Sequence, residues 1–116
     1  MSQDRFVYWN ERKPTKEEIR HVLEDYLSEV AVEIKKDRRG FVVRLAGTYS
    51  FPFKRIDDCS RLVDPSQDGG ERWLEVYIDP KYLDVITRMA DEFTNVVATG
   101  LANVFVRYWG ARLEHG

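Results

Sequence analysis

The first half of the chain carries a strand pattern followed by a helix pattern. Residues 5–9 form a short run of aromatic and β-branched side chains, which predicts a first strand. Thr15 is followed by Glu18 three residues later, the spacing of a capping box, so a helix is expected to begin there. The apolar side chains after this point recur at helical spacing and share one face: Ile19, Val22, Leu23, Tyr26, Leu27 and Val30.

Alternation of period two then replaces the helical spacing and predicts a β-hairpin. Its turn is expected at residues 37–40 (Asp-Arg-Arg-Gly), where glycine can adopt a backbone conformation that other residues avoid. Residues 47–53 can continue as a further strand, which Pro52 would place at an edge of the sheet. Residues 54–71 are polar and rich in turn formers, so we predict one long loop there. One face of the hairpin is expected to carry Val30, Val32, Ile34, Phe41, Val43 and Leu45.

The second half begins with another strand pattern, over residues 73–78. Apolar and polar or aromatic side chains alternate there, as in a strand with one buried face. The buried face is expected to carry Leu74, Val76 and Ile78, and the opposite face Trp73, Glu75 and Tyr77.

A long helical region is expected to follow, over residues 80–109. Asp79 and Pro80 have the character of a helix entrance, an N-cap aspartate with proline at the first helical position. Asp91 can cap a second helix, so we favour two segments, or one helix that bends just before Asp91. Gly110 would end the region, and we expect the tail after it to fray. The apolar positions in helical phase are Tyr82, Ile86, Met89, Phe93, Val97, Leu101, Val104 and Tyr108.

These elements predict an α+β domain with an antiparallel sheet of about four strands. The expected order is β-α-β-β-β-α, with one amphipathic helix and the long C-terminal helical region packed on one face of the sheet. The length of 116 residues is close to the commonest domain size, so residues 1–116 are expected to form a single domain.

Composition narrows the classes of function. Apolar residues make up 43% of the chain and charged residues 33%, with a net charge of −2, so nucleic acid is not the expected partner. Cys59 is the only cysteine, which excludes an internal disulfide and favours a reducing cytoplasm. No run approaches about 18 apolar residues, the length that spans a membrane. Because the motifs of nucleotide, metal and nucleophile chemistry are absent, we expect no catalytic site, cofactor or metal.

Two surfaces are candidates for binding. Trp73, Tyr77, Arg44 and Glu75 are expected to share the sheet face that points away from the helices, and tryptophan, tyrosine and arginine are the usual anchors of protein interfaces. The last helical stretch is apolar around much of its circumference and carries a row of small residues, which would suit a homodimer. The self-association surface is expected to contain Thr94, Ala98, Leu101, Ala102, Phe105 and Trp109.

The function favoured by these features is a non-enzymatic protein-interaction module that binds a larger protein, as a small regulator, inhibitor, immunity-type or accessory protein does. A first alternative is a small enzyme or ligand-binding domain with its site in the loop at residues 54–71, using Arg55, Asp57, Asp58 or Cys59. A second alternative is a nucleic-acid-associated protein that uses the basic turn at residues 35–39.

Overall fold

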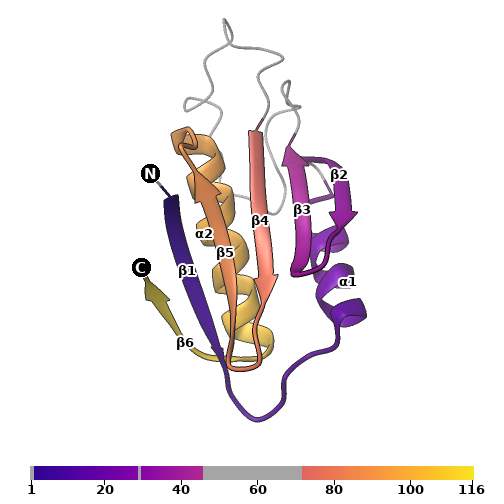
Figure 1. The fold of residues 1–116 in the computed structure, drawn as a ribbon, viewed down its shortest axis with the longest axis vertical. Helices are drawn as coiled ribbons and strands as arrows, with labels where there is room; N and C mark the ends of the chain where they lie inside the picture. The colour runs from indigo at the N-terminus through magenta and orange to yellow at the C-terminus, as the bar shows by residue number, and fades with distance from the viewer. Residues whose placement is uncertain (1, 29, 46–71) are drawn as a thin grey trace, which may run out of the picture.

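The computed structural model describes residues 2–28, 30–45 and 72–116. In this part of the chain six strands form one antiparallel sheet in the order β2-β3-β4-β5-β1-β6 (Figure 1). The elements are, in chain order, β1 (Ser2–Trp9), α1 (Lys16–Tyr26), β2 (Ala31–Lys36), β3 (Gly40–Leu45), β4 (Arg72–Ile78), β5 (Tyr82–Arg88), α2 (Glu92–Tyr108) and β6 (Gly110–His115).

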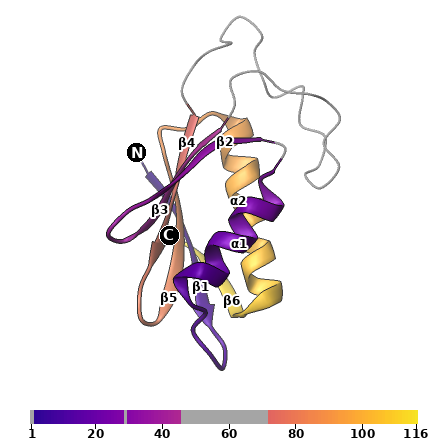
Figure 2. The same ribbon diagram turned by 90° about the vertical axis from the view of Figure 1, so that its right-hand side faces the viewer.

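Both helices lie on the same side of the sheet (Figure 2). α2 packs against β1, β4, β5 and β6, and α1 packs against β2. The helices approach each other where the Tyr26 hydroxyl meets Gly100, at a position where any Cβ atom would overlap that oxygen. The molecule is therefore an α+β structure with its helices on one face of an antiparallel sheet, as predicted, although the described sheet has six strands rather than about four.

The hydrophobic core fills the space between the sheet and the helices. Every described strand except β2 and β6 contributes fully buried apolar side chains, and α2 contributes more than α1. Burial of this apolar area is the main favourable term in folding. The buried core residues are Val7, Ile19, Leu23, Leu27, Val30, Phe41, Val43, Leu45, Leu74, Val76, Leu83, Val85, Phe93, Val97, Ala98, Leu101, Ala102 and Phe105.

The start of α1 is the capping box that the sequence predicts. The Thr15 hydroxyl accepts a hydrogen bond from the Glu18 backbone N–H at 3.1 Å, and the Thr15 N–H donates to Glu18 Oε1 at 3.0 Å. Arg12 donates to both oxygens of Glu18 at 2.8 Å. The bonds from Arg12 and then from the Thr15 N–H lower the pKa of Glu18 to about 2. This helix start is therefore defined by local contacts alone.

The predicted hairpin is formed by β2 and β3, with one difference at its edge. Gly40 closes the turn, where a Cβ atom would collide with the Val76 carbonyl of β4. Val32 was expected on the buried face, but it is 52% exposed. The register shifts between Ala31 and Glu33, and this bulge breaks the alternation that the sequence suggests.

The helix predicted from residue 80 onward is wrong in its first third, because residues 82–88 form β5. Asp79 begins a tight turn instead of a helix: its N–H donates to the Tyr82 carbonyl at 2.9 Å, and its Oδ1 accepts from the Lys81 N–H at 3.0 Å. Aspartate followed by proline suits a β-turn as well as a helix start. The turn joins β4 and β5 into a second hairpin.

The helix cap predicted at Asp91 is confirmed, whereas the frayed tail is not. Asp91 Oδ1 accepts from the backbone N–H of Thr94 at 2.8 Å and begins α2. Met89, just before it, has a positive φ of 46° and separates strand from helix. α2 ends before Gly110 as expected, but the residues after it form β6 and pair with β1. The strand predicted at residues 47–53 lies outside the described residues.

Candidate binding face of the sheet

The four residues predicted to bind a partner lie on one surface of β3 and β4. Strand pairing sets Arg44 directly opposite Trp73. Glu75 and Tyr77 follow Trp73 at every second position of β4, so all three point to the same side. The helices cover the other side, and no described helix or strand covers this one (Figure 2). We call this surface the open face; it consists of Arg44, Trp73, Glu75, Tyr77, Tyr82, Asp84, Ile86, Arg88, Asp4, Phe6, Tyr8, Arg112 and Glu114.

Basic side chains lie over aromatic rings on this face. The Arg44 guanidinium is 6.0 Å from the centroid of the Trp73 ring, and the Arg39 guanidinium is 4.3 Å from that of Tyr77. Such pairs hold both partners by cation–π attraction while their edges stay in water. The stacked guanidinium groups and rings therefore present flat surfaces, held in place by each other, that a partner can cover.

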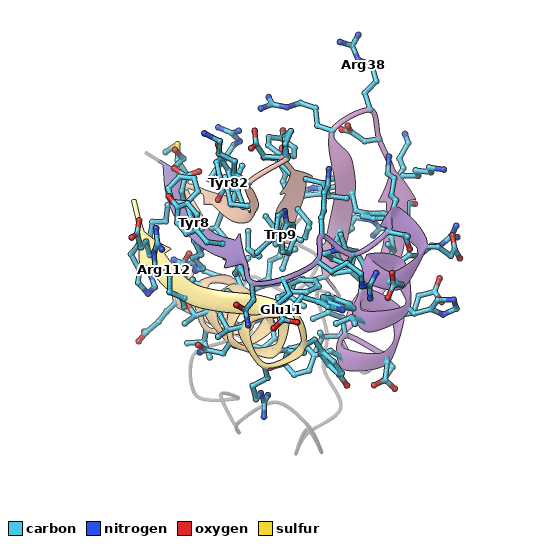
Figure 3. The ribbon with its side chains drawn as sticks, turned by 90° about the horizontal axis from the view of Figure 1, so that it is seen from below. Tyr8, Trp9, Glu11, Arg38, Tyr82 and Arg112 are labelled. Atoms are coloured by element: carbon cyan, nitrogen blue, oxygen red, sulfur yellow. The ribbon has the colours of Figure 1, made fainter. Side chains whose placement is uncertain are left out.

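β5 and β1 add aromatic residues to the open face that were not predicted from the sequence. Phe6 and Tyr82 meet edge to face at 5.1 Å between ring centroids, and Tyr8 lies 5.7 Å from Tyr82. Arg112 of β6 lies 4.3 Å over the Tyr8 ring. Figure 3 shows Tyr8, Tyr82 and Arg112 side by side. Alternation at residues 82–88 was the signal that could have revealed β5 and the position of Tyr82 on one of its faces.

An acidic side chain lies at the centre of the open face. Asp84 stands between Phe6 and Tyr77 in the cross-strand register and is only 6% exposed. Its Oδ1 accepts the backbone N–H of Arg5 at 3.1 Å. Burial, followed by the hydrogen bond and charge repulsion from the Asp4 carboxyl, raises the pKa of Asp84 to about 7. This carboxyl therefore changes its charge near neutral pH.

The predicted self-association surface lies mostly in the core. Thr94, Ala98, Leu101, Ala102 and Phe105 are buried within one chain, where the sheet and α1 already cover them. The small residues of this row let α2 approach the sheet closely. These five side chains are thus unavailable to a second copy in this fold, and their packing explains the apolar pattern of the helix.

Trp109, the sixth residue of that prediction, lies instead beside a groove between the helices. The groove has a volume of about 720 Å³. Trp109 stacks on Phe105 at 6.0 Å between ring centroids, and its neighbour Tyr108 is 63% exposed. The side chains that line the groove with them include Val22, Tyr26, Val104, His21 and Arg107.

The residues proposed for the two alternative functions are the loop residues and the basic turn. Arg55, Asp57, Asp58 and Cys59 lie outside the described residues. The basic turn is the tip of the β2–β3 hairpin, where Arg38 projects away from the rest of the molecule (Figure 3).

In the described ranges no three histidine, cysteine or acidic side chains converge to hold a metal ion. Neither α1 nor α2 combines the length and apolar character that crossing a bilayer requires.

Comparison with known proteins adds no relative. No family model, curated protein or solved structure matches the chain. Its function has to be argued from the open face and the contacts around it.

Proposed function

We propose that the protein is a non-enzymatic interaction module that binds a larger protein through its open face, as a small regulator, inhibitor, immunity-type or accessory protein does. The observation that carries this proposal is the gathering of aromatic side chains from three adjacent strands on a face that no described element covers. These side chains are Phe6, Tyr8, Trp73, Tyr77 and Tyr82. Tryptophan, tyrosine and arginine dominate the binding energy of protein interfaces.

The shape and composition of the open face favour a macromolecular partner over a small molecule. Small molecules bind in concave sites that enclose most of their surface, whereas a sheet face is broad and open. The rings are held by one another and by arginines, so a partner would bury them with little loss of side-chain entropy. Charged pairs, such as Arg88 with Glu75 at 2.8 Å, lie among the rings and add polar contacts that a protein partner can use.

The test is a double variant, Trp73→Ala/Tyr77→Ala, in the tagged full chain. Partners are captured from the native lysate with the wild-type chain and identified, and the Kd of the purified pair is then measured. We expect the variant to bind at least 30-fold more weakly, which corresponds to about 2 kcal/mol. Thermal unfolding should show that both proteins are folded at the assay temperature.

Tyr108→Ala is the matched control, because it removes an exposed aromatic ring from the helical side. The control should keep the wild-type Kd. The proposal would be wrong if the double variant bound normally while Tyr108→Ala lost the partner. That result would move the interface to the groove between the helices.

The basic hairpin tip supports nucleic-acid binding as a second candidate. Arg38 and Arg39 are exposed there, beside the edge of the open face. Binding that weakens steeply with salt and is lost in Arg38→Ala/Arg39→Ala would favour this candidate. The acidic side chains Asp4, Asp84 and Glu75 on the open face oppose a phosphate backbone, so the protein partner remains our first choice.

A further inference from the structure

The centre of the open face has negative charge that no basic side chain of the described chain neutralises. Asp4 is half-buried, Asp84 is almost fully buried, and the two carboxyls interact directly. Within the described ranges, neither forms an ion pair with a lysine or arginine side chain. The nearest arginines of the face are engaged elsewhere: Arg88 donates to Glu75 at 2.8 Å, and Arg112 donates to Glu114 at 3.0 Å.

Arg5 does not fill this role, because its guanidinium lies on the other side of the sheet. That group donates to Thr99 Oγ1 at 2.9 Å and to Asn95 Oδ1 at 3.1 Å, both on α2. Only the backbone N–H of Arg5 reaches Asp84. The Arg5 charge therefore attracts the carboxyl pair from behind the sheet, and no lysine or arginine of residues 2–28, 30–45 and 72–116 forms an ion pair with its outward side.

The groups facing Asp84 make this position suitable for a cation. From β1 it meets Asp4 and Phe6, and from β4 it meets Tyr77, with Glu75 one row away. On its own strand Tyr82 and Arg88 share the face, and Glu114 of β6 lies beyond Phe6. The aromatic faces attract cations, and the two carboxyls offer hydrogen-bond acceptors in a partly desolvated setting.

We propose that the partner of the open face inserts an arginine or lysine side chain over the Asp4–Asp84 pair, between the rings of Phe6, Tyr77 and Tyr82. This inference rests on the proposed function and specifies the chemistry of the partner surface. Two adjacent carboxyls repel each other when both are ionised, and without a cation the raised pKa of Asp84 favours a proton on that carboxyl, which relieves the repulsion. The incoming cation replaces that proton, which is released to the solvent. Binding is therefore accompanied by the release of up to one proton near neutral pH.

The test uses the ethylguanidinium ion, the head group of arginine, as a probe. The apparent pKa of Asp84 is measured by carbon NMR of its carboxyl in the full chain, with ethylguanidinium chloride and with sodium chloride at equal concentration. A probe that binds the ionised pair with a Kd of about 50 mM lowers this apparent pKa by roughly half a pH unit at about 100 mM. N-ethylurea, a neutral molecule of the same shape, should leave it unchanged.

Asp4→Asn provides the control within the protein. This variant removes one charge of the pair but keeps a side chain of the same size, and the effect of ethylguanidinium on Asp84 should largely disappear. Equal pKa values in ethylguanidinium and sodium chloride would overturn the inference, as would an undiminished effect in Asp4→Asn. Neither result measures binding of the protein partner, so the proposed function stands or falls separately on the Trp73→Ala/Tyr77→Ala variant described above.

Discussion

At the scale of single residues, Arg5 and Asp84 connect the two faces of the sheet. The Arg5 side chain is 2% exposed between the sheet and α2, and its hydrogen-bond partners are all neutral. A buried guanidinium needs such a complete set of acceptors. Burial lowers the pKa of Arg5, while Asp84 and Asp4 act in the opposite direction. The carboxyls on one face thus help to stabilise the cation on the other.

Asp84→Asn should make the protein more stable at pH 8 than the wild type, by about 1 kcal/mol. Because the pKa of Asp84 is raised to about 7 in the folded chain, the unfolded chain ionises first as the pH increases from about 4. The wild type therefore loses stability over this interval and none further above it. Asparagine does not titrate and can still accept the Arg5 N–H. Urea unfolding at pH 4 and pH 8 measures the difference.

At pH 4 the advantage of Asp84→Asn should be small, because the carboxyl then carries its proton in the folded chain and is only about half ionised in the unfolded chain. Asp4→Asn should reduce the pH dependence of the wild type, since Asp4 contributes to the raised pKa. The prediction would be wrong if Asp84→Asn raised the free energy of unfolding by the same amount at pH 4 and pH 8. The ionisation of Asp84 would then not explain the pH dependence of wild-type stability.

At the scale of elements, the strand β5 shows why spacing alone can mislead. Tyr82 and Ile86 are four residues apart, and residues at this spacing share a face in a helix and also in a strand. The density of β-branched side chains at residues 85–87 favours a strand, but the Asp-Pro dipeptide before them suggested a helix. What decided the outcome is the hairpin with β4 together with the pairing with β1, and the pairing with β1 is long-range and leaves no local signature.

Elements with local determinants were predicted well. The capping box of α1, the turn at Gly40 and the cap at Asp91 each depend on contacts within a few residues, and each is confirmed. For the same reason alternation along β3 and β4 was enough to place Arg44, Trp73, Glu75 and Tyr77 on one face. Their aromatic neighbours on β1 could not be predicted, because no local pattern indicates which strands lie side by side.

Asp91 should be the most sensitive polar position at the start of α2. Its Oδ1 accepts two hydrogen bonds from Thr94, and its Oδ2 accepts from the buried Arg72 at 2.6 Å. Asp91→Ala removes both the cap and the ion pair with the buried Arg72, so we expect a loss of about 3 kcal/mol in the free energy of unfolding. Asp91→Asn keeps a capping oxygen and should lose less. Equal urea midpoints for the two variants would show that the capping hydrogen bond contributes nothing, because neither variant keeps the ion pair with Arg72.

At the scale of the whole molecule, the first strand is held between elements from the end of the chain. β1 pairs with β5 on one side and with β6 on the other, so both termini lie at the same side of the sheet (Figure 1). The expectation that the tail frays failed because β6 has few apolar residues and its partner is about a hundred residues away. Contacts of this range raise the entropic cost of folding. The open face is therefore complete only when the last strand has paired.

Backbone hydrogen bonds of β6 allow a matched test of this pairing. Asp4 and Gly116 exchange both of their backbone hydrogen bonds, at 3.0 and 3.4 Å. In an antiparallel ladder such pairs recur at every second residue, so the N–H of Glu114 points to β1 and the N–H of His115 points away. Proline is tolerated in an edge strand only where the N–H faces solvent.

Glu114→Pro should therefore lower the free energy of unfolding by about 2 kcal/mol, whereas His115→Pro should change it by less than about 0.5 kcal/mol. Glu114→Ala is the control for the side chain: its ion pair with Arg112 is exposed, so its loss should have little effect. Urea unfolding measures all three, and hydrogen exchange at Phe6 and Tyr8 should increase only in Glu114→Pro. If both proline variants unfolded like the wild type, the tail would be frayed as the sequence alone suggests, and β1 would form the edge of the sheet. The unequal effect of two adjacent prolines, by contrast, has no explanation other than a paired sixth strand.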